Sequence, residues 1–137
     1  MSDNFHPDRE HSCYWAQWKF AYCAPAMKER ARGLGYALLV HGSLARDIDM
    51  VAVPWTDDAV SLDVLVRALT HVCREHNDGV AYGRTAEGER TEDPDMFRRT
   101  HKPHGRVAVS IHLGGGAPHE HMDHGTYVDL SILPIRR

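Results

Sequence analysis

The sequence contains little cysteine and has no long apolar run. No segment approaches the length needed to cross a bilayer, and no apolar segment of the signal-peptide type appears near the N-terminus. The three cysteines, Cys13, Cys23 and Cys73, are an odd number without C-x-x-C spacing. Such cysteines are typical of reduced thiols in a cytosol-like compartment. The sequence therefore predicts a soluble, cytoplasmic protein without a membrane partner.

The chain also lacks an excess of positive charge. Its 16 Lys and Arg residues stand against 19 Asp and Glu residues, for a formal net charge of −3. No overall basic field attracts a polynucleotide, so contact with nucleic acid would need a local basic patch. A length of 137 residues with 42% hydrophobic content is typical of one globular domain. We expect a single domain over 1–137, with a frayed lead-in at 1–11 and a long polar loop at 83–105.

Two helices are predicted from capping residues and helical spacing. Ser12 is a suitable N-cap for the first helix, which Pro25 either ends or restarts, and Gly35 is placed to cap its C-terminal end. Ser61 is a suitable N-cap for the second. The first helix carries Tyr14, Trp15, Trp18, Phe20 and Tyr22. Residues 14, 15, 18 and 22 follow a helical stripe, which we expect to pack in the core, a base-stacking platform being the alternative. The apolar residues of the second are Leu62, Leu65, Val66, Leu69, Val72 and Cys73.

Four main strands are predicted, at residues 36–40, 48–53, 106–113 and 126–133. The first is an unbroken apolar run, which indicates burial on both faces. The last two are expected to pair as an antiparallel hairpin, and 80–82 is a candidate short strand. The predicted fold is α+β, with a mixed sheet of roughly four to five strands and helices mainly on one face.

The candidate site lies where the first two strands are joined, in the sequence YALLVHGSLARDIDMVAVPW. In a strand, residues two apart leave the same face, so Asp47 and Asp49 are expected to project together. Mg²⁺ is usually held by one or two carboxylates together with phosphate and water oxygens. Gly42 lets a phosphate approach the backbone, and the hydroxyl of Ser43 is able to bind it. The pattern predicts a metal and phosphate site.

The HGSLAR and DIDMVAV motifs resemble the nucleotidyltransferase superfamily that includes DNA polymerase β. The resemblance is good over 33–55 and loose at the strand YVDLS, which supplies Asp129. It implies a minimal nucleotidyltransferase core in which Asp47, Asp49 and Asp129 bind Mg²⁺ or Mn²⁺, Asp129 also serving as base. It further implies that Gly42 and Ser43 hold a triphosphate. The short core also resembles small phage-encoded proteins.

The implied activity is transfer of a nucleotidyl group from a nucleoside triphosphate to an unidentified acceptor hydroxyl. Arg46 is a candidate for nucleotide binding, although a salt bridge to the aspartates is the alternative. One departure from the family is plain, because only residues 44–46 separate the Gly-Ser pair from the first aspartate. The alternative function is therefore an inactive binding module that holds a nucleotide, a metal or a host protein.

Two other polar segments are candidates for binding. In segment 83–105 an acidic half precedes a basic half, which either faces an anionic substrate or forms a solvated loop. Its basic residues, together with Arg106, are Arg98, Arg99, His101, Lys102 and His104. The connection HEHMDHG is a rival zinc site, since imidazole and carboxylate groups suit Zn²⁺. Its candidate ligands are His119, Glu120, His121, Asp123 and His124.

Overall fold

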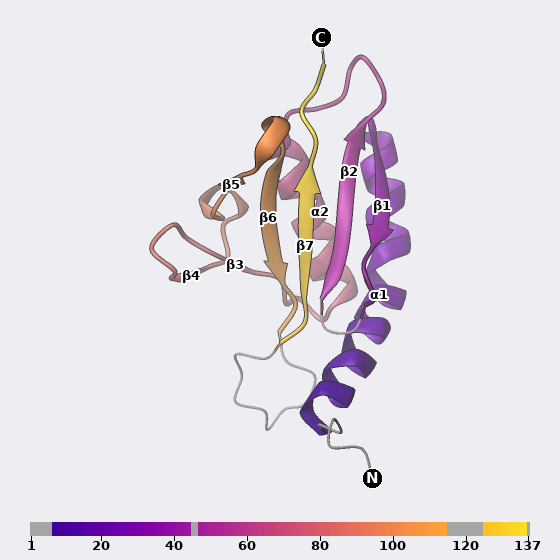
Figure 1. Cartoon of the computed structure of the whole chain (residues 1–137), viewed down its shortest axis with the longest axis vertical. Coiled ribbons are helices and arrows are strands. Elements are labelled where there is room, and N and C mark those ends of the chain that lie inside the picture. The colour runs from indigo at the N-terminus through magenta and orange to yellow at the C-terminus, as the bar shows by residue number, and fades with distance from the viewer. Residues whose placement is uncertain (1–6, 45–46, 115–124, 137) are drawn as a thin grey trace.

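The computed structural model describes residues 7–44, 47–114 and 125–136, with side chains from residue 16 onward. A sheet in the order β1-β2-β7-β6-β5 is covered on one face by α1 and α2 (Figure 1). Strands β2 and β7 are parallel, and the other neighbouring pairs are antiparallel. The predicted α+β fold with a mixed sheet is confirmed. The bounds are α1 Pro7–Gly33, β1 Tyr36–His41, β2 Ile48–Pro54, α2 Leu62–His76, β5 Thr100–His101, β6 Val107–His112 and β7 Tyr127–Ile132.

The hydrophobic core lies between the sheet and the two helices. Because side chains alternate along a strand, each strand buries one set of apolar residues against the helices. In the three central strands this set is Ile48, Met50, Ala52, Val109, Ile111, Val128, Leu130 and Ile132. The intervening residues of these strands point to the opposite face, which we call the open face. The polar side chains of the sheet are gathered there.

Helix α1 is longer than the sequence predicts, and it differs in the face that it buries. It begins at Pro7 rather than after Ser12, and it continues through Pro25 without ending. Trp18 and Tyr22 are 40% and 56% exposed, so the prediction that they pack in the core is wrong. The buried face consists mostly of smaller side chains, Ala16, Cys23, Ala24, Met27 and Ala31. These allow α1 to lie close to its neighbours.

Strand β1 is buried on one face only. Its residues alternate between buried and accessible, and Leu39 is 55% exposed, so the predicted burial on both faces is wrong. The reason is its position at the edge of a sheet that has helices on one side. Gly35 ends the preceding turn at φ +93°, where a Cβ would lie 2.6 Å from Cα of Ala59. Glycine is required there by both conformation and space.

Helix α2 follows the predicted pattern. The backbone N–H of Val64 donates to Oγ of Ser61, the predicted N-cap, at 3.4 Å. Five of the six predicted apolar residues are buried, namely Leu65, Val66, Leu69, Val72 and Cys73, and Leu62 is half-buried at the start of the helix. Neither α1 nor α2, the helices of the described part of the chain, is long and apolar enough to span a membrane.

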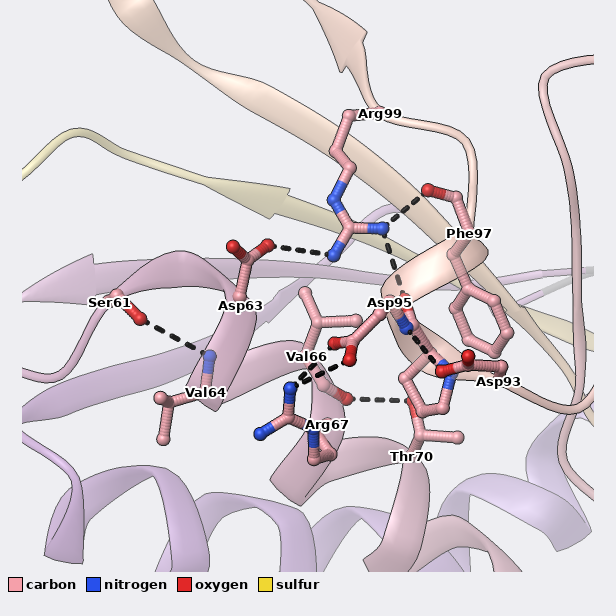
Figure 2. A network of polar contacts seen from close by, with 11 residues as sticks. Ser61, Asp63, Val64, Val66, Arg67, Thr70, Asp93, Asp95, Phe97 and Arg99 are labelled. Carbon is pink, nitrogen blue, oxygen red and sulfur yellow. Dashed lines mark hydrogen bonds and ion pairs between the residues drawn. The ribbon is translucent and has the colours of Figure 1, made fainter.

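Segment 83–105, expected as a long polar loop, is built from short elements and fixed to α2. It contains β3 Gly83–Arg84, β4 Arg90–Thr91, the 3-10 turn η1 Pro94–Met96, β5 and the 3-10 turn η2 Pro103–Gly105. Arg99 donates to Oδ1 of Asp63 at 2.9 Å and to the carbonyls of Pro94 and Phe97, as Figure 2 shows. The Phe97 ring is buried against Gly83, where a Cβ would lie 2.4 Å from it.

Candidate functional site

A row of four polar side chains crosses the open face of the sheet. His41 in β1 lies opposite Asp49 in β2, Asp49 lies opposite Asp129 in β7, and Asp129 lies opposite Ser110 in β6. Residues opposite each other in a sheet share a face, so all four lie on the same side. Ser110 Oγ donates to Oδ1 of Asp129 at 2.8 Å. The structure therefore brings together two of the three predicted carboxylates, from positions distant in the sequence.

The third predicted carboxylate, Asp47, is placed differently. Strand β2 begins at Ile48, and Asp47 is half-buried in the bend before it. The alternation of side chains along β2, from which Asp47 and Asp49 were predicted to share a face, therefore does not apply to Asp47. Asp47 also does not line the pocket that contains Asp49 and Asp129. Among the side chains that the structure describes, in residues 16–44, 47–114 and 125–136, no three His, Cys, Asp or Glu groups are placed to hold a metal.

Gly42 allows the Asp49 carboxylate to approach the turn after β1. Its φ is +79°, and a Cβ at this position would lie 2.5 Å from Oδ2 of Asp49. The space that glycine leaves is thus occupied by an acidic side chain, where the sequence predicted a phosphate. Ser43 follows on the exposed surface. Arg46, the predicted nucleotide ligand, lies outside the described residues.

A basic rim surrounds one side of the polar row. The pocket has a volume of about 420 Å³, and its floor is formed by β6, β7 and the polar row. Four cationic side chains line it, Arg84, Arg98, Lys102 and Arg106. They outnumber the two carboxylates Asp49 and Asp129, so the pocket carries a net positive charge within a chain whose net charge is −3. This excess of cationic side chains suits the binding of an anionic ligand.

Two arginines of the basic rim, Arg98 and Arg106, differ in the hydrogen bonds that they make. Arg98 donates from Nη2 to the carbonyls of Thr85 and Ala86, at 3.2 and 3.1 Å, so it supports the turn between β3 and β4. Arg106 instead has a buried Nε without a hydrogen-bond partner among the residues that the structure describes. A buried donor left unsatisfied is costly. The Arg106 side chain also lines the pocket, where its guanidinium is able to meet an anionic ligand.

An aromatic stack stands at one end of the pocket. The His112 ring lies 5.2 Å from the ring of Tyr82 on one side and 5.2 Å from that of Tyr127 on the other. The guanidinium of Arg90 lies 3.8 Å from the centre of the Tyr82 ring. Burial, followed by the nearby positive charge of Arg84, lowers the pKa of His112. A neutral imidazole therefore borders the basic rim.

Sequence reasoning identified part of this site and missed part of it. It gave Asp49, Asp129 and Gly42, and it noted that Arg98, Lys102 and Arg106 were able to face an anion. It missed Arg84, His112 and Ser110, although the alternation of VAVSIH places Ser110 and His112 on the polar face of their strand. The rival zinc loop, His119 to His124, lies outside the described residues.

Comparisons with protein-family models, with curated proteins and with solved structures found no match for this chain.

Proposed function

We propose that the protein binds a nucleoside triphosphate with Mg²⁺ or Mn²⁺ in the open-face pocket and transfers its nucleotidyl group to an acceptor hydroxyl. The observation that carries this proposal is the placement of Asp49 directly opposite Asp129 on parallel strands, inside a pocket with a basic rim. Carboxylates attract a cation and the rim attracts an anion, so the site suits a complex of both. A nucleoside triphosphate with its metal is such a complex, and it agrees with the cytoplasmic location expected from the sequence.

The basic rim would hold the phosphates. Arg106 would offer its guanidinium and Lys102 a compact positive charge, since both side chains line the pocket. The polyphosphate would then lie between the rim and the carboxylates. A fixed arrangement of donors stabilises negative charge on a transferring phosphoryl group without reorganisation.

The carboxylates fit a divalent ion in their chemistry. Mg²⁺ is bound through one or two carboxylates together with substrate phosphates, and Asp49 and Asp129 supply two on adjacent strands. Gly42 keeps one oxygen of Asp49 free of steric contact with the turn. When bound, the ion would offset charge on the phosphates and lower the pKa of the attacking hydroxyl. Asp47, in the bend before β2, does not line this pocket, so its predicted role as a third ligand is tested separately.

The residues of the chain have separate roles in the proposed reaction. Ser110 donates to Oδ1 of Asp129 and so fixes the orientation of that carboxylate. Asp129 would accept the proton of the acceptor hydroxyl as it attacks the α-phosphate, which breaks the bond to pyrophosphate. His41, opposite Asp49 at the end of β1, borders the same space and is available to contact the acceptor.

The test is release of pyrophosphate with each of the four ribonucleoside triphosphates in the presence of Mg²⁺ or Mn²⁺. We expect release that requires the metal and that falls at least about 100-fold in Asp49→Asn and in Asp129→Asn, as for loss of a major electrostatic contribution. Asp47→Asn tests the third carboxylate separately. Asp58→Asn changes an exposed aspartate that does not line the pocket, and it should leave the rate unchanged. Equal rates in all four variants would refute the transfer.

Binding without transfer is the second candidate function, and one observation favours it. No group of three metal-binding side chains is assembled in the described parts of the chain, and Asp47 is not in the pocket. A protein of this kind would bind a nucleotide or a metal, or present that complex to a protein partner. Calorimetry that detects metal-dependent triphosphate binding, weakened by Asp49→Asn, without pyrophosphate release would select this function.

A further inference from the structure

Strand β1 forms one edge of the sheet and carries none of the features that block pairing with another strand. Its sequence, YALLVH, has no Lys, Arg, Asp, Glu, Pro or Gly. Natural sheets usually protect an edge with charge, proline or a bulge, because its outward N–H and C=O groups are ready to pair. Leu39, in the middle of this strand, is 55% exposed. The edge is therefore apolar, regular and accessible.

The outer stripe of α1 flanks the same edge. A groove of about 590 Å³ lies between α1 and β1, and Lys28, Glu29 and Arg32 line its helix side. Residues 18, 22, 25, 29 and 32 follow one another at steps of three and four, so they share one stripe of the helix. The far end of this stripe carries Trp18 and Tyr22, which are exposed and lie in contact at a ring separation of 5.8 Å. One edge thus combines an apolar strand with exposed aromatic side chains.

We propose that this edge is a dimer interface, in which β1 pairs antiparallel with β1 of a second copy across a two-fold axis at Leu39. Opposite residues must share a face of the sheet, and an axis through Leu39 meets this condition. Leu39 then faces Leu39 of the second copy on the open face, and Leu38 faces Val40 on the helix side. Every pair in the centre of the interface is apolar, and the two sheets continue as one.

A second copy fits this surface better than an unrelated peptide does, because the surface is complementary to itself. The two-fold axis sets the two α1 helices antiparallel on the same side of the joined sheet. The cationic end of one stripe, with Arg32, then approaches the aromatic end of the other, with Tyr22 and Trp18, as cation–π contacts require. Near the axis, Glu29 of each copy approaches Lys28 of the other. A peptide would satisfy the strand but leave these charges and rings uncovered.

The dimer is independent of the proposed function, since the polar row lies on the open face and does not require a partner. Only His41 connects the two sites, because it lies in β1 and also lines the pocket. In the proposed pairing it faces Ala37 of the second copy, on the face that carries the pocket. Dimer formation and ligand binding are therefore measurable separately.

Sedimentation velocity and light scattering on the full chain test the proposal. We expect twice the mass of the chain for the unmodified protein and a single-chain mass for Leu39→Lys, which places a charge at the axis without changing a buried residue. Val64→Lys is the matched control, since Val64 is a similarly accessible aliphatic residue on α2, away from β1, and it should remain dimeric. Circular dichroism confirms that each variant is folded. A single-chain mass for the unmodified protein at all concentrations would overturn the proposal.

A cross-linking measurement tests the axis itself. In Leu39→Cys the two introduced thiols face each other, so mild oxidation should give a covalent dimer in high yield. Val64→Cys should not do so, and the unmodified protein reports any reaction of Cys13. Cys23 and Cys73 are buried. A dimer that survives Leu39→Lys and fails to cross-link through residue 39 uses another surface, and this outcome would also overturn the proposal.

Discussion

A methyl group at Gly42 would lie 2.5 Å from Oδ2 of Asp49. This contact links the turn after β1 to the carboxylate row, and it makes Gly42→Ala a specific probe of the site. The obstructed atom is the end of a side chain, so we expect the carboxylate to rotate while the backbone stays in place. Triphosphate binding measured by calorimetry should weaken at least about tenfold, a cost comparable to one lost charge-assisted contact. The positive φ should also cost about 1–3 kcal/mol of stability in urea unfolding.

Gly79→Ala separates the two expected effects of Gly42→Ala, which are the contact with Asp49 and the strain of a positive φ. Gly79 has φ +81°, close to that of Gly42, but no atom lies within 4 Å of a Cβ placed there. It should lower the free energy of unfolding by a similar amount and leave ligand binding unchanged. If Gly79→Ala weakened binding as much as Gly42→Ala, the contact with Asp49 would have no special role.

Arg99 holds the segment that carries the basic rim, and its removal should loosen that rim. Its side chain is 19% exposed and binds two backbone carbonyls as well as Asp63 (Figure 2). Arg99→Ala leaves these carbonyls without their donor, so we expect a loss of about 2 kcal/mol in the free energy of unfolding. Arg67→Ala is the matched control, because the Arg67–Asp95 pair is exposed on both sides and should contribute much less. Urea unfolding of both variants shows whether the loss in the free energy of unfolding depends on the burial of the arginine or only on the loss of an ion pair.

Much of the fold was predictable from local patterns. The apolar residues of α2 recur at helical spacing, and Ser61 precedes the first of them as the N-cap. The helix and its buried face were therefore both predicted. The hairpin of β6 and β7 was also predicted, and it brings Asp129 into the sheet. Asp49 was identified from the alternation of side chains along its strand, whereas Asp129 was identified only through the resemblance to the nucleotidyltransferase superfamily.

The errors arose where tertiary position overrides a local pattern. The apolar run of β1 was compatible with burial on both faces, and only its place at the sheet edge leaves Leu39 exposed. Pro25 is tolerated within α1 on the exposed side of the helix, which local rules do not reveal. The basic rim combines Arg84 with Arg106 from distant positions, and no periodicity in a polar segment indicates which of its charges meet.

Arg106 should be sensitive even to replacement by lysine, because its guanidinium lines the pocket and presents several donors in a fixed plane. Arg106→Lys keeps the positive charge and removes this planar arrangement of donors. We expect triphosphate affinity to fall about tenfold, the effect of one hydrogen bond to a charged group. Arg136→Lys is the control, since Arg136 is exposed outside this pocket. Unchanged affinity in Arg106→Lys would show that only the charge matters.

His112 should make stability depend on pH in mildly acidic solution. Burial and the charge of Arg84 lower its pKa in the folded protein, so the unfolded chain takes up a proton at this position more readily. Stability rises with pH wherever the unfolded state binds more protons. The contribution of His112 is therefore complete above about pH 6.5, where an ordinary histidine titrates. It is lost as the pH falls from there through the folded pKa.

The substitution His112→Phe tests this because it keeps an aromatic ring between Tyr82 and Tyr127 but removes the titrating group. Urea unfolding between neutral and mildly acidic pH should show a smaller loss of stability in His112→Phe than in the unmodified protein. His101→Phe, at an exposed position in β5, controls for the loss of any one histidine and should retain the steeper dependence. Parallel pH profiles for His112→Phe and the unmodified protein would show that another group, and not the stacked imidazole, causes the acid sensitivity.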